Sequence, residues 1–199
     1  MFLWYPEYRR LIVDGFLEII LKLQVFEHFN PDAIAGTATA GIPYAILLAD
    51  AMGLPMAYIR DKPKDHGLRN QIEGIDANKD LGKSRVLVIE DLISTGGSSA
   101  KAVQAVRNAR GIVPYCLSIF NYGLPKAVDM FKGIVPFGKE EGEQLKEPCM
   151  VISLLHYEQL LSVAIDHGFI DKNNEEMLRE WMSDQENWDH KHNLQKTEK

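Results

Sequence analysis

Apolar residues recur at helical spacing near the start of the chain and in short continuous runs further on. From residue 8 to residue 29, apolar positions 12, 16, 19, 20, 23 and 26 share one helical face, and Pro6 suits the first turn of such a helix. Buried strands are predicted by the runs PDAIAG, PMAYIR, RVLVIED, VPYCLSIF and CMVISLL. Because helical patterns separate several of these runs, the sequence predicts an α/β domain with a mostly parallel sheet flanked by helices.

Further helices are predicted at residues 40–53, 97–109, 156–168 and 172–182. Periodicity is lost from about Asp184, so we expect one domain over residues 1–184 and a frayed tail over residues 185–199. Residues 61–84 are polar, charged and rich in turn formers, and they exceed the length of an ordinary connection. Such a segment is either functional or disordered.

Composition narrows the class of protein. The 199 residues carry a net charge of −6, which disfavours a general nucleic-acid-binding surface. Only two cysteines are present, each in an apolar run, which favours a reducing, cytoplasmic compartment over a disulfide scaffold. The longest apolar run is interrupted by Asp50, Gly53 and Pro55, so no membrane span or export signal is expected.

An acid pair stands directly before a turn of glycines and hydroxyls in EDLISTGGSS, residues 90–99. We expect Glu90 and Asp91 at the end of a strand, the edge where parallel sheets hold ligands. The turn offers backbone N–H groups at a helix N-terminus, which suits a phosphate, while carboxylates accept hydrogen bonds from sugar hydroxyls or hold them through a metal. The segment therefore favours a ribose 5-phosphate. The alternative is a pair of acids that only offsets the helix dipole.

Two other loops suit anions. Small residues fill AGTATAG, residues 35–41, so the backbone there can approach a second anionic group, although a plain strand-to-helix turn is the alternative. Basic residues are concentrated in IRDKPKDHG, at the end of the predicted strand PMAYIR, and they suit a multiply charged phosphate ligand. The alternative is that these residues are simply exposed to solvent. The GxxxxGKS and GxGxxG nucleotide-binding patterns do not occur in the sequence.

The segment VLVIEDLISTGGS resembles the phosphoribosyl-pyrophosphate motif of the type I phosphoribosyltransferases. IAGTATAGIPYA is similar to the pyrophosphate loop of that family, and YIRDKPKDHG to its mobile catalytic loop, whose KDHG points to the orotate phosphoribosyltransferases. The likeness extends from about Tyr5 to Trp188 and includes the C-terminal helices. It implies the type I phosphoribosyltransferase fold with a long mobile loop at about residues 61–78.

The resemblance implies transfer of ribose 5-phosphate from phosphoribosyl pyrophosphate (PRPP) to orotate, which yields orotidine 5′-phosphate and pyrophosphate for pyrimidine (UMP) biosynthesis. It implies Mg²⁺ held mainly by PRPP and water, and a homodimer with shared active sites. Arg60, Lys64 and His66 are the catalytic candidates, and Ser94 is expected to contact orotate as well as PRPP. The remaining candidates for PRPP binding are Glu90, Asp91, Leu92, Ile93, Thr95, Gly96, Gly97, Ser98, Thr37, Ala38, Thr39 and Lys62.

The chain also departs from the family pattern. Members usually carry a few dozen residues before the position of Tyr5, including a base-binding segment that this sequence does not show. Asp61 and Ala40 stand where lysines occur in relatives, and IFNYGLP lacks an arginine with which many members contact orotate. Orotate transfer remains the leading hypothesis, and these departures keep two alternatives open beside it: a phosphoribosyltransferase for another base, or a non-catalytic regulatory protein that binds PRPP.

Overall fold

A computed structural model describes residues 2–62, 71–75, 80–134, 148–185 and 187–188. The chain divides into two compact units, residues 1–156 and 157–199, which are described separately. The domain boundary expected near residue 184 stays a prediction.

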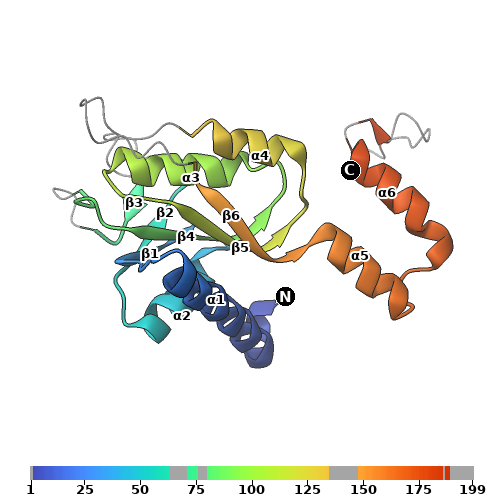
Figure 1. Cartoon of the computed structure of the whole chain (residues 1–199), viewed down its shortest axis with the longest axis horizontal. Coiled ribbons are helices and arrows are strands. Elements are labelled where there is room, and N and C mark those ends of the chain that lie inside the picture. Colours follow the sequence, from blue (N-terminus) through green and yellow to red (C-terminus); the bar gives the residue numbers. More distant parts are fainter. Residues whose placement is uncertain (1, 63–70, 76–79, 135–147, 186, 189–199) are drawn as a thin grey trace. The chain divides into compact units, whose positions relative to one another are not determined.

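A six-stranded sheet forms the centre of the first unit (Figure 1). The strand order is β3-β2-β1-β4-β5-β6, and every neighbouring pair is parallel except β2 and β3. The predicted mostly parallel α/β architecture is therefore confirmed. The strands are β1 (Ala33–Thr37), β2 (Met56–Ile59), β3 (Ile72–Glu73), β4 (Val86–Ile93), β5 (Tyr115–Asn121) and β6 (Met150–His156).

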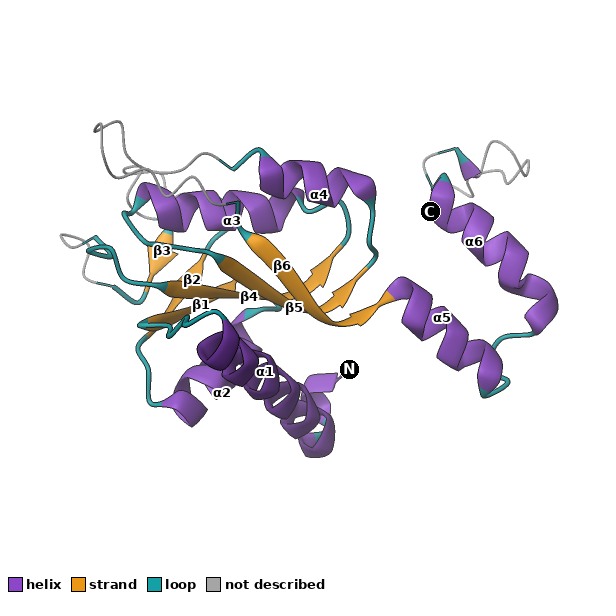
Figure 2. Ribbon diagram, viewed as in Figure 1, coloured by secondary structure: helices purple, strands orange, loops and turns teal. Residues whose placement is uncertain are grey.

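Helices cover both faces of this sheet (Figure 2). One face packs against α1 (Pro6–Phe26) and α2 (Ile42–Met52), and the other against α3 (Gly97–Asn108) and α4 (Pro125–Lys132); a short 3-10 turn, η1 (Phe2–Trp4), precedes α1. Each face has its own apolar core, with Leu87 and Ile89 of β4 on the α1 side and Val88 on the α3 side. Burial on both faces explains why β4 has a continuous apolar sequence. In the part of the chain that the structure describes, no helix combines the length and apolar character needed to cross a membrane.

Helix α1 follows its predicted face for most of its length. Ile12, Phe16, Ile20 and Leu23 are buried, but Phe26, on the same predicted face, is 75% exposed. The helix ends at Phe26, and the backbone N–H of Phe29 donates to the Leu23 carbonyl at 3.1 Å. This turn brings Phe29, which is 6% exposed, into the core in place of Phe26.

Three local features differ from the sequence-based expectation. Strand β4 continues to Ile93, so Glu90 and Asp91 lie within the strand rather than at its end. Part of the expected loop after β2 forms β3, where Ile72 pairs with Ile59. Helix α4 was not expected, since only Ala127 and Phe131 of its eight residues are buried and the apolar signal is correspondingly short.

An ion pair lies at the amino-terminal ends of β1 and β4. These are the ends opposite those that carry the candidate loops. The Arg85 side chain donates to both carboxylate oxygens of Asp32 at 3.0 and 2.9 Å, and the Arg85 backbone N–H donates to Asp32 at 2.8 Å. These hydrogen bonds lower the pKa of Asp32 to about 2. The pair joins the start of β1 to the start of β4.

We expect Asp32→Asn to change how stability depends on pH. A depressed pKa in the folded state contributes stability above the unfolded value, near 4, and that contribution is lost as pH falls toward 2. Urea unfolding midpoints of wild type and Asp32→Asn should therefore differ near neutral pH and converge between about pH 4 and pH 2. Arg85→Met, which removes the cation and keeps the acid, should reproduce the change. A difference that stays constant over this pH range contradicts the assignment.

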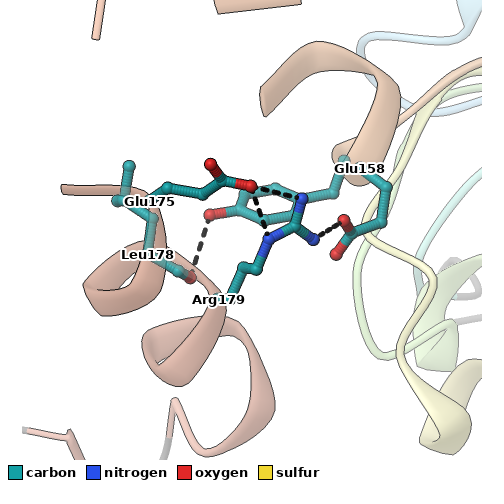
Figure 3. Close-up of polar contacts among 5 residues, drawn as sticks. Glu158, Glu175, Leu178 and Arg179 are labelled. Carbon is teal, nitrogen blue, oxygen red and sulfur yellow. Dashed lines mark hydrogen bonds and ion pairs between the residues drawn. The ribbon is translucent and has the colours of Figure 1, made fainter. Parts of the chain in front are cut away.

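The second unit contains α5 (Tyr157–Asp166), a 3-10 turn η2 (Lys172–Asn174) and α6 (Glu175–Ser183), close to the two helices predicted there. Arg179 joins the two helices, because its guanidinium is paired with Glu158 of α5 and donates to Glu175 at 3.0 and 3.1 Å (Figure 3). The Tyr157 hydroxyl also donates to the Leu178 carbonyl of α6 at 3.2 Å.

Candidate active site

The strand order reverses between β1 and β4. From β1 the chain continues outward to β2, whereas β4 pairs with the opposite side of β1 and continues to β5. Helix α2 follows β1 on one face of the sheet, and α3 follows β4 on the other. Open α/β sheets bind ligands beyond the carboxyl ends of their strands at such a reversal. The loops that follow β1 and β4 are therefore the primary candidates for the site.

The loop after β1 packs tightly against the sheet on one side and is exposed to solvent on the other. The Gly41 N–H donates to the Thr37 carbonyl at 3.0 Å, and the Ala38 N–H donates to the Ile59 carbonyl at 2.8 Å. A Cβ on Gly41 would lie 2.5 Å from the Ile89 carbonyl oxygen and 2.5 Å from Thr37 Oγ1. Thr39 and Ala40 are exposed, and the Ala38–Thr39 peptide bond is cis. The loop thus exposes small residues and backbone to solvent, while hydrogen bonds and close packing hold its two ends against the strands.

The turn after β4 has two glycines with different roles. Gly96 has a φ of +77°, and a Cβ there would lie 3.0 Å from Ala127 Cα, so both conformation and space require glycine. Gly97 begins α3, and a Cβ there would meet no atom within 4 Å. The first N–H groups of an α-helix have no partner within the helix. Gly97 therefore leaves an open approach to the helix N-terminus, beside exposed Thr95 and Ser98 and half-buried Ser94.

Glu90 lies beneath both loops and is buried, with 7% of its surface exposed. Its Oε1 accepts hydrogen bonds from Thr37 Oγ1 at 2.7 Å and from the Asp91 N–H at 3.0 Å, and its Oε2 accepts from Ser99 Oγ at 2.8 Å. Burial raises the pKa of Glu90, and the Asp91 side chain adds to the rise, while the Thr37 and Ser99 hydroxyls oppose it. These bonds direct the carboxylate inward.

Asp91 is the more accessible acid of the pair. It is half-buried, and its negative charge adds to burial in raising the pKa of the Tyr44 hydroxyl on α2. Asp91 therefore lies within electrostatic reach of Tyr44, near the start of α2. A carboxylate in that position is able to accept hydrogen bonds from the hydroxyls of a ligand.

The other predicted residues are distributed unevenly. Arg60 follows β2, the neighbour of β1, and its Nη1 lies 3.3 Å from Glu73 Oε1 of β3, while Lys62 is exposed. Leu92 is 41% exposed, whereas Ile93 is buried, backbone included. Lys64 and His66, and much of the loop predicted at about residues 61–78, lie outside the described residues.

Ser99 is a residue that the sequence-based site did not include. Its hydroxyl bonds to Glu90, and it is 3% exposed on the buried face of α3. The signal that separates it from exposed Ser98 is helical phase, since Ser99 shares its face with buried Val103 and Val106.

Among the described residues, no group of three or more His, Cys, Asp or Glu side chains is arranged to hold a metal ion.

Comparison with known proteins gives consistent matches. Residues 13–129 match the model of the phosphoribosyl transferase domain family. The chain is 44% identical over 180 residues to an orotate phosphoribosyltransferase of Staphylococcus haemolyticus, covering 90% of this chain and 78% of that protein. It is 39% identical over 184 residues to an orotate phosphoribosyltransferase of Coxiella burnetii, covering 92% and 78%.

Solved structures share the fold. The orotate phosphoribosyltransferase of Aeropyrum pernix matches with a TM-score of 0.60 and 23% identity over 84% of this chain and 80% of that chain. Adenine phosphoribosyltransferase of Saccharomyces cerevisiae matches with a TM-score of 0.56 and 21% identity over 77% and 82%. UMP synthase of Leishmania donovani matches with a TM-score of 0.65 and 22% identity over 91% of this chain, which spans 34% of that larger protein.

Proposed function

The chain belongs to the orotate phosphoribosyltransferase family, and from that premise we propose that it transfers ribose 5-phosphate from PRPP to orotate, with release of pyrophosphate. The reaction forms orotidine 5′-phosphate, the precursor of UMP. The proposal rests on one observation: the loops at residues 37–41 and 94–98 both suit anions, and the Glu90 carboxylate links their bases through Thr37 and Ser99. PRPP has a phosphate at one end, a pyrophosphate at the other and a ribose diol between, so one molecule satisfies the whole arrangement.

Each part of the site has a role in this proposal. The turn at residues 94–98 binds the 5-phosphate through backbone N–H groups and hydroxyls, and Asp91 accepts hydrogen bonds from the ribose hydroxyls. The loop at residues 37–41 holds the pyrophosphate. As the bond at the anomeric carbon breaks, positive charge develops on the sugar and negative charge on the leaving group, so catalysis depends on electrostatic stabilisation and positioning.

The basic residues serve the leaving group in this proposal. Arg60 and Lys64 stabilise the departing pyrophosphate, His66 donates a hydrogen bond or a proton to it, and Lys62 adds positive charge beside Asp61. The pairing of Arg60 with Glu73 keeps its guanidinium at the end of β2. Ser94, which follows β4, is proposed to contact orotate.

The proposal includes Mg²⁺ bound to PRPP, where the ion neutralises charge on the pyrophosphate. It also includes a homodimer with shared active sites, which rests on the family resemblance. The cytoplasmic location stays a prediction from the two reduced, buried cysteines.

Gly97→Ala is expected to weaken PRPP binding without loss of stability. The added Cβ meets no protein atom within 4 Å, and alanine lowers the entropy of the unfolded chain. The methyl group would instead occupy space that the phosphate needs, with loss of at least one charged hydrogen bond and about tenfold or more in affinity. Calorimetric titration with PRPP and urea unfolding measure the two effects. Unchanged affinity would place the phosphate elsewhere.

The activity itself is tested with purified protein, Mg²⁺, PRPP and orotate. We expect loss of orotate absorbance that requires PRPP and is matched mole for mole by released pyrophosphate. Absence of turnover, with PRPP still bound, would support the regulatory alternative instead.

A further inference from the structure

A buried hydrogen-bonded cluster lies under the two anion loops. It consists of Thr37, the last residue of β1, Glu90 of β4, and Ser99 in the first turn of α3. Thr37 is 5% exposed, Glu90 7% and Ser99 3%. We refer to these three residues as the carboxylate tie.

The tie connects elements that are far apart in sequence. Thr37 and Glu90 are separated by 53 positions, and their side chains meet at 2.7 Å. The Thr37 hydroxyl is also 3.2 Å from the Ile89 carbonyl oxygen, while Ser99 reaches the other carboxylate oxygen of Glu90 at 2.8 Å. A single carboxylate therefore holds the end of β1 and the start of α3 against β4.

Both candidate loops begin or end at this tie. The loop at residues 38–41 starts directly after Thr37, and Gly41 packs against Thr37 and Ile89 with no room for a Cβ. The phosphate turn at residues 94–98 lies between Glu90 and Ser99 in the sequence. A displacement of Thr37 or of the start of α3 relative to β4 would stretch or break a hydrogen bond to Glu90. Buried polar groups resist this because a group left without its partner pays its full desolvation cost.

We propose that Thr37 and Ser99 are positioning residues which, through Glu90, set the distance between the pyrophosphate loop and the 5-phosphate turn. The inference rests on the proposed function, since it takes PRPP as the ligand that spans both loops. In this role the hydrogen bonds to Glu90 act on the two loops, and Asp91 is the more accessible acid for the sugar. Fixing two subsites relative to one another raises the effective concentration of the second contact once the first has formed. The gain in affinity therefore applies only to a ligand that occupies both subsites.

The test compares PRPP with its two halves. Dissociation constants for PRPP, ribose 5-phosphate and inorganic pyrophosphate, each with Mg²⁺, are measured by calorimetric titration for wild type and Thr37→Val, which keeps the side-chain shape and removes the hydroxyl. We expect PRPP affinity to fall about tenfold, the cost of one buried hydrogen bond, while both halves change less than about twofold. Ser99→Ala should behave likewise, and it decides the matter if Thr37→Val does not fold. Thr37→Ser, which keeps the hydroxyl, should bind PRPP with the wild-type affinity.

A matched control separates positioning from general destabilisation. Ser118→Ala removes another buried hydroxyl from the same sheet, where Ser118 Oγ lies 2.7 Å from Ser153 Oγ, and should leave all three affinities unchanged. Equal weakening of all three ligands in Thr37→Val, unchanged PRPP affinity, or the same loss in Ser118→Ala would each overturn the inference. Failure of wild type to bind PRPP would instead overturn the proposed function.

Discussion

Replacing Asp91 with asparagine is expected to lower kcat/KM for PRPP by about 10- to 150-fold, the range for loss of a hydrogen bond to a charged group. Asp91, in β4, is the more accessible member of the acid pair. Asparagine keeps the size and one acceptor oxygen but loses the charge that binds sugar hydroxyls and faces the positive charge developing on the ribose. Steady-state kinetics with varied PRPP at saturating orotate measure the loss.

Stability distinguishes this effect from damage to the fold. Because the Asp91 side chain is only half-buried, the urea unfolding midpoint of Asp91→Asn should stay close to that of wild type. Asp50→Asn, an exposed acid on α2, provides the control with unchanged kinetics. Wild-type kcat/KM in Asp91→Asn would remove the proposed contact with the ribose.

Gly41→Ala is expected to lower both stability and activity. The backbone of Gly41 has φ of −74° and ψ of −23°, which alanine adopts readily, so the difficulty is space alone. The new Cβ would lie 2.5 Å from the Ile89 carbonyl oxygen and 2.9 Å from the Thr37 nitrogen, and both are backbone atoms in strands. Overpacking of this kind costs about 1–3 kcal/mol of unfolding free energy.

The loss of activity in Gly41→Ala should exceed the loss of stability. Relief of the contact requires the loop to move away from Thr37, and misplacement by about 1 Å is able to reduce turnover about 100-fold. Gly133→Ala is the matched control, since a Cβ there would approach no atom closer than 3.5 Å and φ is −76°. Normal pyrophosphate affinity and turnover in Gly41→Ala would show that the loop after β1 does not bind the leaving group.

Local patterns predicted most of the elements because their signals lie within a few residues. The apolar runs became β1, β2, β4, β5 and β6, and the spacing of Ile12, Phe16 and Ile20 identified α1. Strand β3 was missed because its two residues depend on pairing with β2 rather than on their own sequence. Phe26 shares the apolar face but is exposed, because periodicity cannot show that the helix ends there and that Phe29 is buried instead.

The segments of the candidate site carry local sequence signals, but the contacts between them do not. The glycines and hydroxyls of residues 94–98 predict a phosphate-binding turn from composition alone, the family resemblance added the ribose and pyrophosphate, and these roles stay predictions. The bonds from Glu90 to Thr37 and Ser99 join three elements of the fold, so no local window contains them. The sequence consequently assigned both acids the same role, whereas the structure gives Glu90 and Asp91 different surroundings.

The most direct test of orotate transfer is a side-by-side comparison of bases. Wild-type protein is incubated with PRPP and Mg²⁺ and with orotate, adenine or uracil, and the nucleotide products are separated and quantified by chromatography. Orotidine 5′-phosphate should form in amounts equal to the pyrophosphate released, with at least 100-fold higher kcat/KM for orotate than for either other base, about 2.7 kcal/mol of discrimination. Formation of AMP or UMP in preference to orotidine 5′-phosphate, or PRPP binding with no nucleotide product, would contradict it.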